Sequence, residues 1–285
     1  MSQIEPQEPD DVTREVASET DKVIEVSELV KSFDGRCVLD GITLDVRRGE
    51  TMVIMGGSGC GKSTLLRHMI GSYMPDSGCV KVFGEELTTA DEETLNGLRL
   101  RMGVLFQSGA LYNSMTVGEN VALPMREHTD LAEDIIKIMV KMKLELVGLR
   151  EFDDLTPAQI SGGMKKRVGL ARAIALDPEI LFYDEPTAGL DPIVAGVIDV
   201  LIMDLSRKLG VTSVVVTHDM NSAFKIANRM VMLYQGKVVA QGTADDIRNS
   251  TDERVQQFIT GAPDGPIPLR MSKTDYVTDL MDGKP

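Results

Sequence analysis

One stretch near the start of the chain combines residue types that suit phosphate binding. It has the spacing G-x-x-x-x-G-K-S and runs Gly56-Gly57-Ser58-Gly59-Cys60-Gly61-Lys62-Ser63-Thr64. Glycines let the backbone adopt positive φ angles, so that its N–H groups and the next helix N-terminus can face an anion. Lys62 would place its charge on the β- and γ-phosphates of a nucleotide, and the Ser63 hydroxyl would join the ligands of a Mg²⁺ ion. The alternative, a glycine-rich turn that only packs a helix on a strand, is disfavoured by the Lys-Ser pair and the flanking strand and helix patterns.

Polar residues also follow three apolar segments that are typical of buried parallel strands. The segments are 102–106, 180–183 and 213–217, and the residues are Gln107, Asp184, Glu185 and His218. Because ligands bind beyond the carboxyl ends of the strands in an open parallel sheet, we expect these residues to meet the phosphate loop at one edge. Asp184 is suited to contact Mg²⁺ through water, and Glu185 to take a proton from an attacking water. The alternatives are an acid that caps the turn after its strand and a histidine that is only hydrogen-bonded.

An α/β arrangement must position these residues. We predict strands at 52–55, 79–84, 102–106, 180–185, 213–217, 230–234 and 237–240, and helices at 65–70, 91–101, 131–146, 164–175, 193–208, 221–228 and 245–249. The alternating segment 23–26 predicts an edge strand, which joins 42–46 in an antiparallel β-layer. Residues 108–176 form a mainly helical insertion, in which Thr156-Pro157 opens a further helix.

The composition narrows the classes of function. The 285 residues carry a formal net charge of −14, which disfavours nucleic acid as a partner. No apolar run approaches the roughly 20 residues that span a bilayer, and the N-terminus lacks the pattern of a signal peptide. The three cysteines lack metal-binding spacing. Residues 1–21 are acidic and predict a flexible leader.

A longer motif makes a family resemblance specific: Ile160-Ser161-Gly162-Gly163-Met164-Lys165-Lys166-Arg167. It resembles the signature motif of ATP-binding cassette (ABC) ATPases, with Met164 in place of the usual glutamine. The motifs continue in the family's order with Asp184-Glu185-Pro186-Thr187 and then Ala188-Gly189-Leu190-Asp191-Pro192, which is similar to the D-loop. Gln107 matches the Q-loop, His218 the switch histidine and Phe33 the aromatic residue that stacks on adenine. The resemblance covers residues 23–250.

This resemblance implies a fold, two cofactors and a set of roles. The implied fold is an α/β P-loop NTPase of the ABC type, with a mostly parallel sheet core, an antiparallel β-layer and a helical subdomain. The cofactors are ATP and Mg²⁺. Glu185, His218 and Lys62 would be catalytic; residues 56–64, Phe33 and Gln107 would bind ATP; and Ser63, Gln107 and, through water, Asp184 would hold the metal. The chain would then divide into a leader (1–21), an ATPase domain (22–250) and an extension (251–285).

The resemblance also implies a second copy of the chain. Ser161, Gly162 and Gly163 would bind the γ-phosphate of an ATP molecule held by the phosphate loop of the partner, and Asp191 would be the D-loop residue. A helix N-terminus that arrives with the partner brings a dipole and free N–H donors, so one copy alone would hold half of each site.

A narrower similarity joins the segments 105–112, 120–129, 254–258 and 264–268 to the ABC ATPases of MCE-type lipid transport systems. It implies ATP-driven phospholipid transport at the cytoplasmic face of the inner membrane. The implied partners are an integral membrane permease, an MCE-type lipid-binding subunit and a small accessory protein. Candidate permease contacts are Tyr112, Met115, Val117 and Leu123, with local packing as the alternative. Two rival functions remain: an importer ATPase for a small solute, and a soluble ABC protein that does not transport.

The extension at 251–285 is predicted to be an interaction element. It carries Val255, Phe258 and Ile259 at helical spacing, followed by Ile267, Pro268, Leu269 and Tyr276. Prolines and glycines at 261–268 prevent the chain from continuing as a helix. The extension could bury these apolar residues on its own cassette, the partner cassette or an accessory subunit, and we favour the partner cassette.

Overall fold

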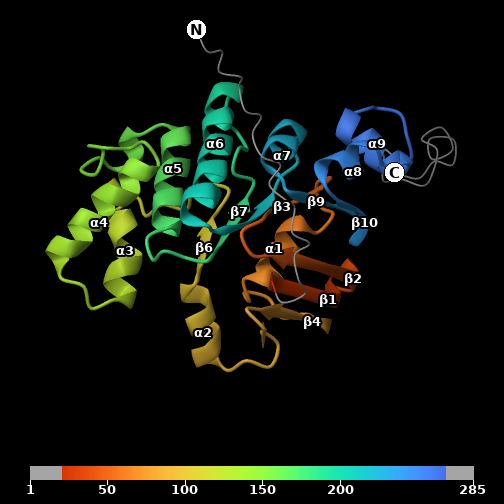
Figure 1. The fold of residues 1–285 in the computed structure, drawn as a ribbon, viewed down its shortest axis with the longest axis horizontal. Coiled ribbons are helices and arrows are strands. Elements are labelled where there is room, and N and C mark those ends of the chain that lie inside the picture. Colours follow the sequence, from red (N-terminus) through yellow and green to blue (C-terminus); the bar gives the residue numbers. More distant parts are fainter. Residues whose placement is uncertain (1–20, 268–285) are drawn as a thin grey trace, which may run out of the picture.

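Two β-sheets organise the fold of residues 21–267, the part of the chain that the computed structural model describes (Figure 1). The larger sheet has the strand order β10-β9-β3-β8-β7-β6, and the smaller has the order β2-β1-β4-β5. The strands are β1 Lys22–Phe33, β2 Arg36–Arg47, β3 Thr51–Gly56, β4 Ser77–Val82, β5 Glu85–Glu86, β6 Met102–Leu105, β7 Ile180–Asp184, β8 Thr212–Val216, β9 Arg229–Tyr234 and β10 Lys237–Gly242. All pairs in the larger sheet are parallel except β9 with β10, which confirms the predicted, mostly parallel core.

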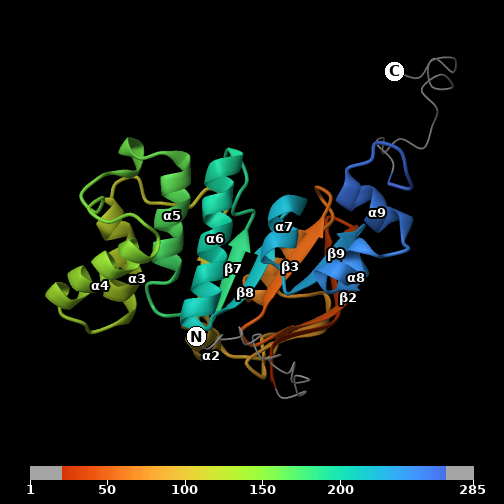
Figure 2. The same cartoon turned by 45° about the horizontal axis from the view of Figure 1, so that its top comes forward.

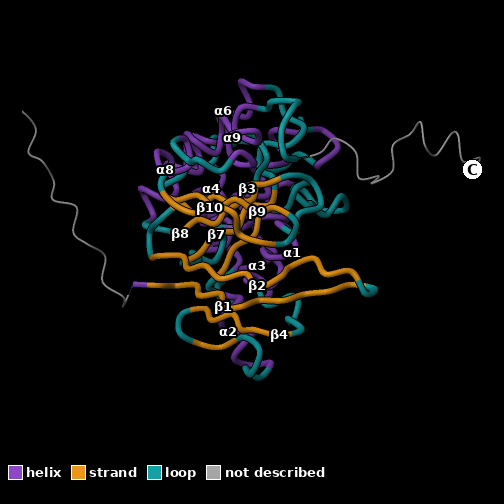
Figure 3. The backbone as a smooth tube through the Cα atoms, turned by 90° about the vertical axis from the view of Figure 1, so that its right-hand side faces the viewer, coloured by secondary structure: helices purple, strands orange, loops and turns teal. Residues whose placement is uncertain are grey.

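Alternate residues of the larger sheet face two different cores, because successive side chains of a strand point to opposite faces. In β3, Val53 and Met55 belong to one core, and Met52 and Ile54 belong to the other. Both faces are therefore covered, which explains why every residue of β3 and β8 is buried. Figure 3 shows the smaller sheet as a separate layer beside the larger one.

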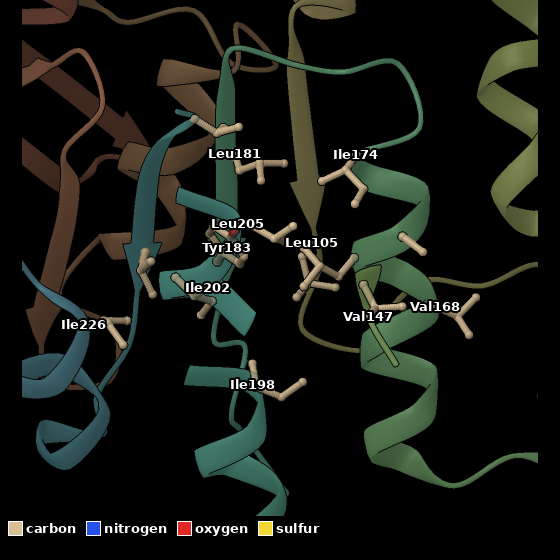
Figure 4. Close-up of a cluster of buried hydrophobic side chains, with 14 of the residues drawn as sticks. Leu105, Val147, Val168, Ile174, Leu181, Tyr183, Ile198, Ile202, Leu205 and Ile226 are labelled. Carbon is tan, nitrogen blue, oxygen red and sulfur yellow. The ribbon is translucent and has the colours of Figure 1, made fainter. Parts of the chain in front are cut away.

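Helices surround the larger sheet. They are α1 Lys62–Met69, α2 Glu92–Leu100, α3 Val117–His128, α4 Glu133–Leu146, α5 Gly162–Ala173, α6 Pro192–Leu209, α7 Met220–Ile226, α8 Ala244–Arg248 and α9 Glu253–Thr260. Helices α3 and α4 lie at the opposite end of the molecule from α8 and α9 (Figures 1 and 2). Leu65, Leu66 and Met69 of α1 pack into the core shared with the smaller sheet. Figure 4 shows the opposite core, in which Leu105, Leu181 and Tyr183 of the strands lie near Val168, Ile174, Ile198, Ile202 and Leu205 of α5, α6 and their ends.

The antiparallel layer corrects one prediction. The segment 23–26 does not form an edge strand, because β1 lies between β2 and β4 in the smaller sheet. Both β1 and β2 are also longer than predicted, at 12 residues each, and their pairing contains register shifts. These irregularities interrupt the alternation of apolar and polar residues from which a strand is predicted.

The helical insertion contains one helix that the sequence pattern did not predict. Helix α3 includes Pro124, a residue that usually ends or kinks a helix. Its start is nevertheless marked by a capping box, in which Thr116 and Glu119 satisfy each other's backbone N–H groups. Thr156-Pro157 opens only a short 3₁₀ turn, Pro157–Gln159, and not a full helix. Val117 is fully buried, so its environment is the local packing that was the alternative to a permease contact.

The chain beyond residue 250 begins by packing on its own cassette. Val255 is fully buried, and Phe258, Ile259 and Ile267 contact the same core as α5 and α6. The Gln257 side chain accepts a hydrogen bond from the Ile267 N–H at 2.7 Å, which folds the chain back over α9. Residues 1–20 of the predicted leader and residues 268–285, including Pro268, Leu269 and Tyr276, lie outside the described residues. Within residues 21–267, we find no helix whose length and hydropathy would allow it to cross a membrane.

Candidate functional site

The phosphate loop joins the end of β3 to the start of α1, as the motif predicts. Gly56 has φ of +146°, and a Cβ atom there would lie 2.2 Å from the carbonyl oxygen of Leu233. Gly61 caps α1 with φ of +104°, and a Cβ atom there would lie 2.9 Å from the carbonyl oxygen of Val38. These two positions admit only glycine, because neighbouring backbone approaches the loop too closely for any side chain. Ser58 and Gly59 are exposed at the mouth of the loop.

Lys62 is buried and folds back along this loop. Its Nζ donates hydrogen bonds to the carbonyl oxygens of Gly56, at 2.8 Å, and Gly57, at 3.0 Å. The ammonium of Lys62, the first residue of α1, is therefore held against the start of the phosphate loop. Cys60 is also buried in the loop, and this burial raises the pKa of its thiol, an effect that the nearby Lys62 charge opposes.

The predicted acidic residues lie beside the loop because β7 is separated from β3 by a single strand. The Ser63 hydroxyl donates to Oδ1 of Asp184 at 3.0 Å. One oxygen of Glu185, Oε2, lies 2.9 Å from Nδ1 of His218. The structure thus brings Ser63, Asp184, Glu185 and His218 together at one sheet edge.

Glu185 has an unusual backbone conformation for a non-glycine residue, with φ of +50°. Its N–H donates to the carbonyl oxygen of Val216 at 2.9 Å, which ties the end of β7 to the end of β8. Its side chain is only 12% exposed, whereas that of His218 is 64% exposed. Glu185 is therefore mostly enclosed, and the exposed His218 lies beside its carboxylate.

Oxygen atoms at this edge fit a hard divalent cation. Mg²⁺ takes oxygen ligands, keeps several waters and usually needs only one or two protein ligands beside substrate phosphates. The adjacent oxygens of Ser63 and Asp184 match that description. No group of three or more His, Cys, Asp or Glu residues within 21–267 could hold a metal by itself.

The remaining predicted residues lie around this centre. Gln107 follows β6, the strand next to β7, and its side chain is exposed. Phe33 ends β1, is 39% exposed and packs edge-on against Tyr73 with the ring centroids 5.7 Å apart. Both side chains are therefore accessible to a ligand.

The predicted signature residues begin α5, on the other side of the larger sheet from α1. Ser161 and Gly162 are exposed, and Ser161 caps the helix by accepting a hydrogen bond from the Met164 N–H at 3.3 Å. Gly163 packs against Val194 of α6, so closely that an added Cβ atom would lie 2.4 Å from a Val194 methyl carbon. Asp191 caps α6 and accepts hydrogen bonds from two backbone N–H groups, at 3.0 and 3.1 Å. The starts of α5 and α6 therefore form one surface, on a different face from the phosphate loop helix.

The model of the family described as ABC transporter matches residues 39–188 of this chain. The chain belongs to the ABC transporter family. ABC ATPases bind ATP and assemble as dimers of cassettes. One similar structure is the dimer of the ATP-binding cassette MJ0796 in a post-hydrolysis state, bound to ADP and Pi. It has a TM-score of 0.72 and 30% sequence identity, with coverage of 78% of this chain and 98% of that chain. The cbiO1 cassette of Clostridium perfringens, part of the transporter complex cbiONQ, has a TM-score of 0.74 and 31% identity, with coverage of 80% and 90%.

Curated relatives cover nearly the whole ABC cassette. The intermembrane phospholipid transport system ATP-binding protein MlaF of Escherichia coli (strain K12) is 47% identical over 248 residues, which is 87% of this chain and 92% of that protein. MlaF of Haemophilus influenzae is 44% identical over 260 residues, with coverage of 91% and 98%. The probable ribonucleotide transport ATP-binding protein mkl of Mycobacterium leprae is 40% identical over 252 residues, with coverage of 88% and 73%.

The sequence did not predict the contacts of two cationic residues on α5. Lys166 of α5 is 4% exposed, and its Nζ donates to the backbone oxygen of Glu185 at 3.0 Å. Arg172, also on α5, donates to the backbone oxygens of Gly109, at 2.9 Å, and Ala110, at 2.7 Å, in the turn after Gln107. The sequence carried one signal for a buried Lys166. This residue lies three positions after Gly163 and four before Leu170, so it shares a helix face with them, and all three are buried in α5.

Proposed function

We propose that this chain is the ATP-hydrolysing subunit of a transporter that moves phospholipid through a separate membrane permease. The observation that carries this proposal is the similarity to MlaF proteins of two organisms over 92% and 98% of their lengths. The third relative, named as a probable ribonucleotide transport protein, is less similar, and the chain covers a smaller share of it. A small-solute importer is the second candidate, since it would use the same ATP site.

ATP would bind with its phosphates in the loop 56–64. Lys62 would turn from the loop carbonyls towards the β- and γ-phosphates, which attract its charge more strongly. Ser63, Gln107 and, through water, Asp184 would hold Mg²⁺, which supplies positive charge to the phosphate oxygens when bound. Phe33 would stack on the adenine ring, because its aromatic side chain is partly exposed at the end of β1.

Glu185 would act as the general base that takes a proton from the attacking water. Glu185 follows the buried strand β7 and the Asp184 that bonds Ser63, so its carboxylate would face a water beside the bound phosphates. His218 would hold Glu185 Oε2 in place through the 2.9 Å contact and complete the site on the solvent side.

A second copy would complete each ATP site. Ser161, Gly162 and Gly163 begin α5 on the face of the larger sheet opposite α1, which suits contact with the nucleotide of a partner rather than their own. The exposed N-terminus of α5 would bind the γ-phosphate there. Asp191 would lie at the same interface, since Gly163 packs directly against the start of α6.

The permease would dock in a groove beside the turn after β6. The groove has a volume of about 790 Å³ and is lined in part by Phe106, Tyr112, Leu123 and Pro124. Tyr112 is 53% exposed, and exposed aromatic side chains are favoured at protein interfaces. Because this turn follows Gln107 directly, a change at the phosphates would move residues that line the groove.

The remaining partners and boundaries belong to the same proposal. An MCE-type lipid-binding subunit and a small accessory protein would join the permease, and the chain would lie at the cytoplasmic face of the inner membrane. The ATPase domain would occupy 22–250, with the helical subdomain at about 108–176.

Beyond the ATPase domain, the extension would hold the partner cassette through residues after Ile267. Deleting 268–285 should weaken dimer assembly, measured by light scattering, but leave ATP binding intact; unchanged dimers and transport would refute this role.

The central test of the proposed function uses the variant Glu185→Gln in the purified membrane complex. We expect ATP binding to persist and hydrolysis to fall by about 10²-fold or more, the typical size of general-base catalysis. The exposed Glu145→Gln is the matched control and should hydrolyse ATP normally. Lys62→Ala should lose ATP binding itself.

The lipid part of the proposal needs a separate measurement. The complex captured from membranes through this chain should contain phospholipid, and ATP should drive phospholipid transfer between vesicles. Glu185→Gln should abolish that transfer. A complex that carries no phospholipid, and whose ATP hydrolysis responds to a small solute, would instead support the importer function.

A further inference from the structure

Lys166 is a buried cation beside the predicted catalytic acids. Its side chain is 4% exposed, and its ammonium donates a 3.0 Å hydrogen bond to the backbone oxygen of Glu185. Burial lowers the pKa of this ammonium, and the nearby carboxylates of Glu185 and Asp184 oppose that effect. A buried ammonium is costly unless it is well paired, so its presence here needs a reason beyond core packing.

Lys166 contacts Glu185 where the backbone is strained. A left-handed backbone at a non-glycine residue such as Glu185, with φ of +50°, persists only when its surroundings hold it. Three hydrogen bonds do so here: Glu185 N–H donates to Val216 at 2.9 Å, and the Glu185 oxygen accepts from the Ala188 N–H, at 3.2 Å, and from Lys166. The first two come from the sheet and from the following turn. Only Lys166 comes from α5.

We propose that Lys166 is a positioning residue for Glu185, through which α5 controls the general base of its own chain. This inference rests on the proposed function, in which Glu185 is the base. The N-terminus of the same helix carries Ser161, Gly162 and Gly163, which would contact the ATP molecule of the partner. Helix α5 therefore connects the γ-phosphate contact of one ATP site to the base of the other.

The distances explain how such a connection would work. Gly163 and Lys166 are three residues apart, which is less than one turn of α5. A shift of the helix N-terminus therefore moves both residues together. The hydrogen bond between Lys166 and Glu185 is 3.0 Å long, and a shift of about 1 Å would take it beyond hydrogen-bonding range. Occupation of one site would thereby set the position of Glu185 in the other.

The test compares Lys166→Met with the wild-type full-length chain. Methionine has nearly the same length as lysine but has no hydrogen to donate. We expect kcat for ATP hydrolysis to fall roughly 10- to 100-fold, as small displacements of catalytic groups do, with KM for ATP within about twofold of wild type. Lys166→Arg, which retains a donor, should recover part of the activity. Lys166→Leu, which also has no hydrogen to donate, serves the same comparison if the methionine variant folds poorly.

A second readout separates control of Glu185 from damage to the signature contact. If Lys166 acts on Glu185, ATP should still close the dimer of Lys166→Met chains, and the dimer should accumulate because hydrolysis is slow. Light scattering with ATP should then show the same dimer that Glu185→Gln forms. Failure to dimerise would mean that the substitution damages the signature residues instead, and it would overturn the proposal.

Lys143→Met is the matched control for loss of a buried lysine. Lys143 is 6% exposed on α4 and pairs with Asp177, away from Glu185. It should lower thermal stability and leave kcat within about twofold of wild type. Equal losses of kcat in both lysine variants, or normal kcat in Lys166→Met, would refute the inference. Normal turnover in Glu185→Gln would refute the proposed function itself, which separates the two failures.

Discussion

Asn120 is a fully buried residue of α3 whose side chain holds the turn between β6 and that helix. Its Oδ1 accepts a hydrogen bond from the Tyr112 N–H at 2.8 Å. Its Nδ2 donates to the carbonyl oxygens of Tyr112, Met115 and Thr116 at 3.1, 3.3 and 2.8 Å. Replacing it with alanine removes four hydrogen bonds from the segment that leads from Gln107 to the helical insertion.

The cost of Asn120→Ala follows from which groups lose their partner. The carbonyl oxygens of Tyr112 and Thr116 keep backbone donors, from Met115 and from residue 120 itself. The Tyr112 N–H loses its Asn120 acceptor, and an unsatisfied donor costs about 1–3 kcal/mol. Adding a net contribution of roughly 0.5–1.5 kcal/mol for the other hydrogen bonds gives a total of about 1.5–4.5 kcal/mol.

Urea unfolding followed by circular dichroism measures this loss. Asn113→Ala is the matched control, because Asn113 is an exposed asparagine of the same turn. It should change the free energy of unfolding by less than about 0.5 kcal/mol, as surface substitutions usually do. A loss below about 1 kcal/mol for Asn120→Ala, or an equal loss in both variants, would contradict the role assigned to these hydrogen bonds.

Three further predictions follow from single side chains. Gly56→Ala should abolish binding of a fluorescent ATP analogue, because its Cβ would lie 2.2 Å from the Leu233 oxygen; retained binding would refute this geometry. Iodoacetamide should modify exposed Cys37 faster than Cys60, whose burial raises the pKa of its thiol, and equal rates would contradict that burial. Burial also raises the pKa of Asp199, so folding stability should fall as pH rises through this folded-state pKa. Asp199→Asn should be more stable than the parent near pH 7, with the gap closing towards about pH 4, and the opposite trend would refute it.

Local motifs made the phosphate loop and the order of the strands predictable. A loop with Gly56, Gly61 and Lys62 has few alternative conformations, because its glycines are required by close backbone contacts that any such loop makes. The placement of Asp184 and His218 was predictable for a different reason. Buried parallel strands end at one edge, so the residues that follow them are neighbours even when they are far apart in sequence.

Contacts between distant segments were not predictable in the same way. Helix α3 was missed because Pro124 contradicts a helical pattern, although the Thr116 capping box marks its start. The position of β1 inside its sheet depends on pairing with β4, some 50 residues later, which alternation within β1 does not encode. Lys166 could be recognised as a basic residue in a motif, but its hydrogen bond to Glu185 depends on how α5 packs against the end of β7.

The central place of β3 in the larger sheet has a consequence for protein synthesis. Thr51 pairs with Ser213 and Met52 with Arg229, so the strand before the phosphate loop waits for partners made roughly 160–180 residues later. At typical ribosomal rates of about 5–20 residues per second, this interval lasts on the order of 10–30 s. The nascent chain therefore carries its most recognisable nucleotide-binding motif for most of its synthesis without the sheet that shapes it. ATP binding becomes available only near the completion of the cassette, which makes nucleotide a ligand of the finished fold and not of its early intermediates.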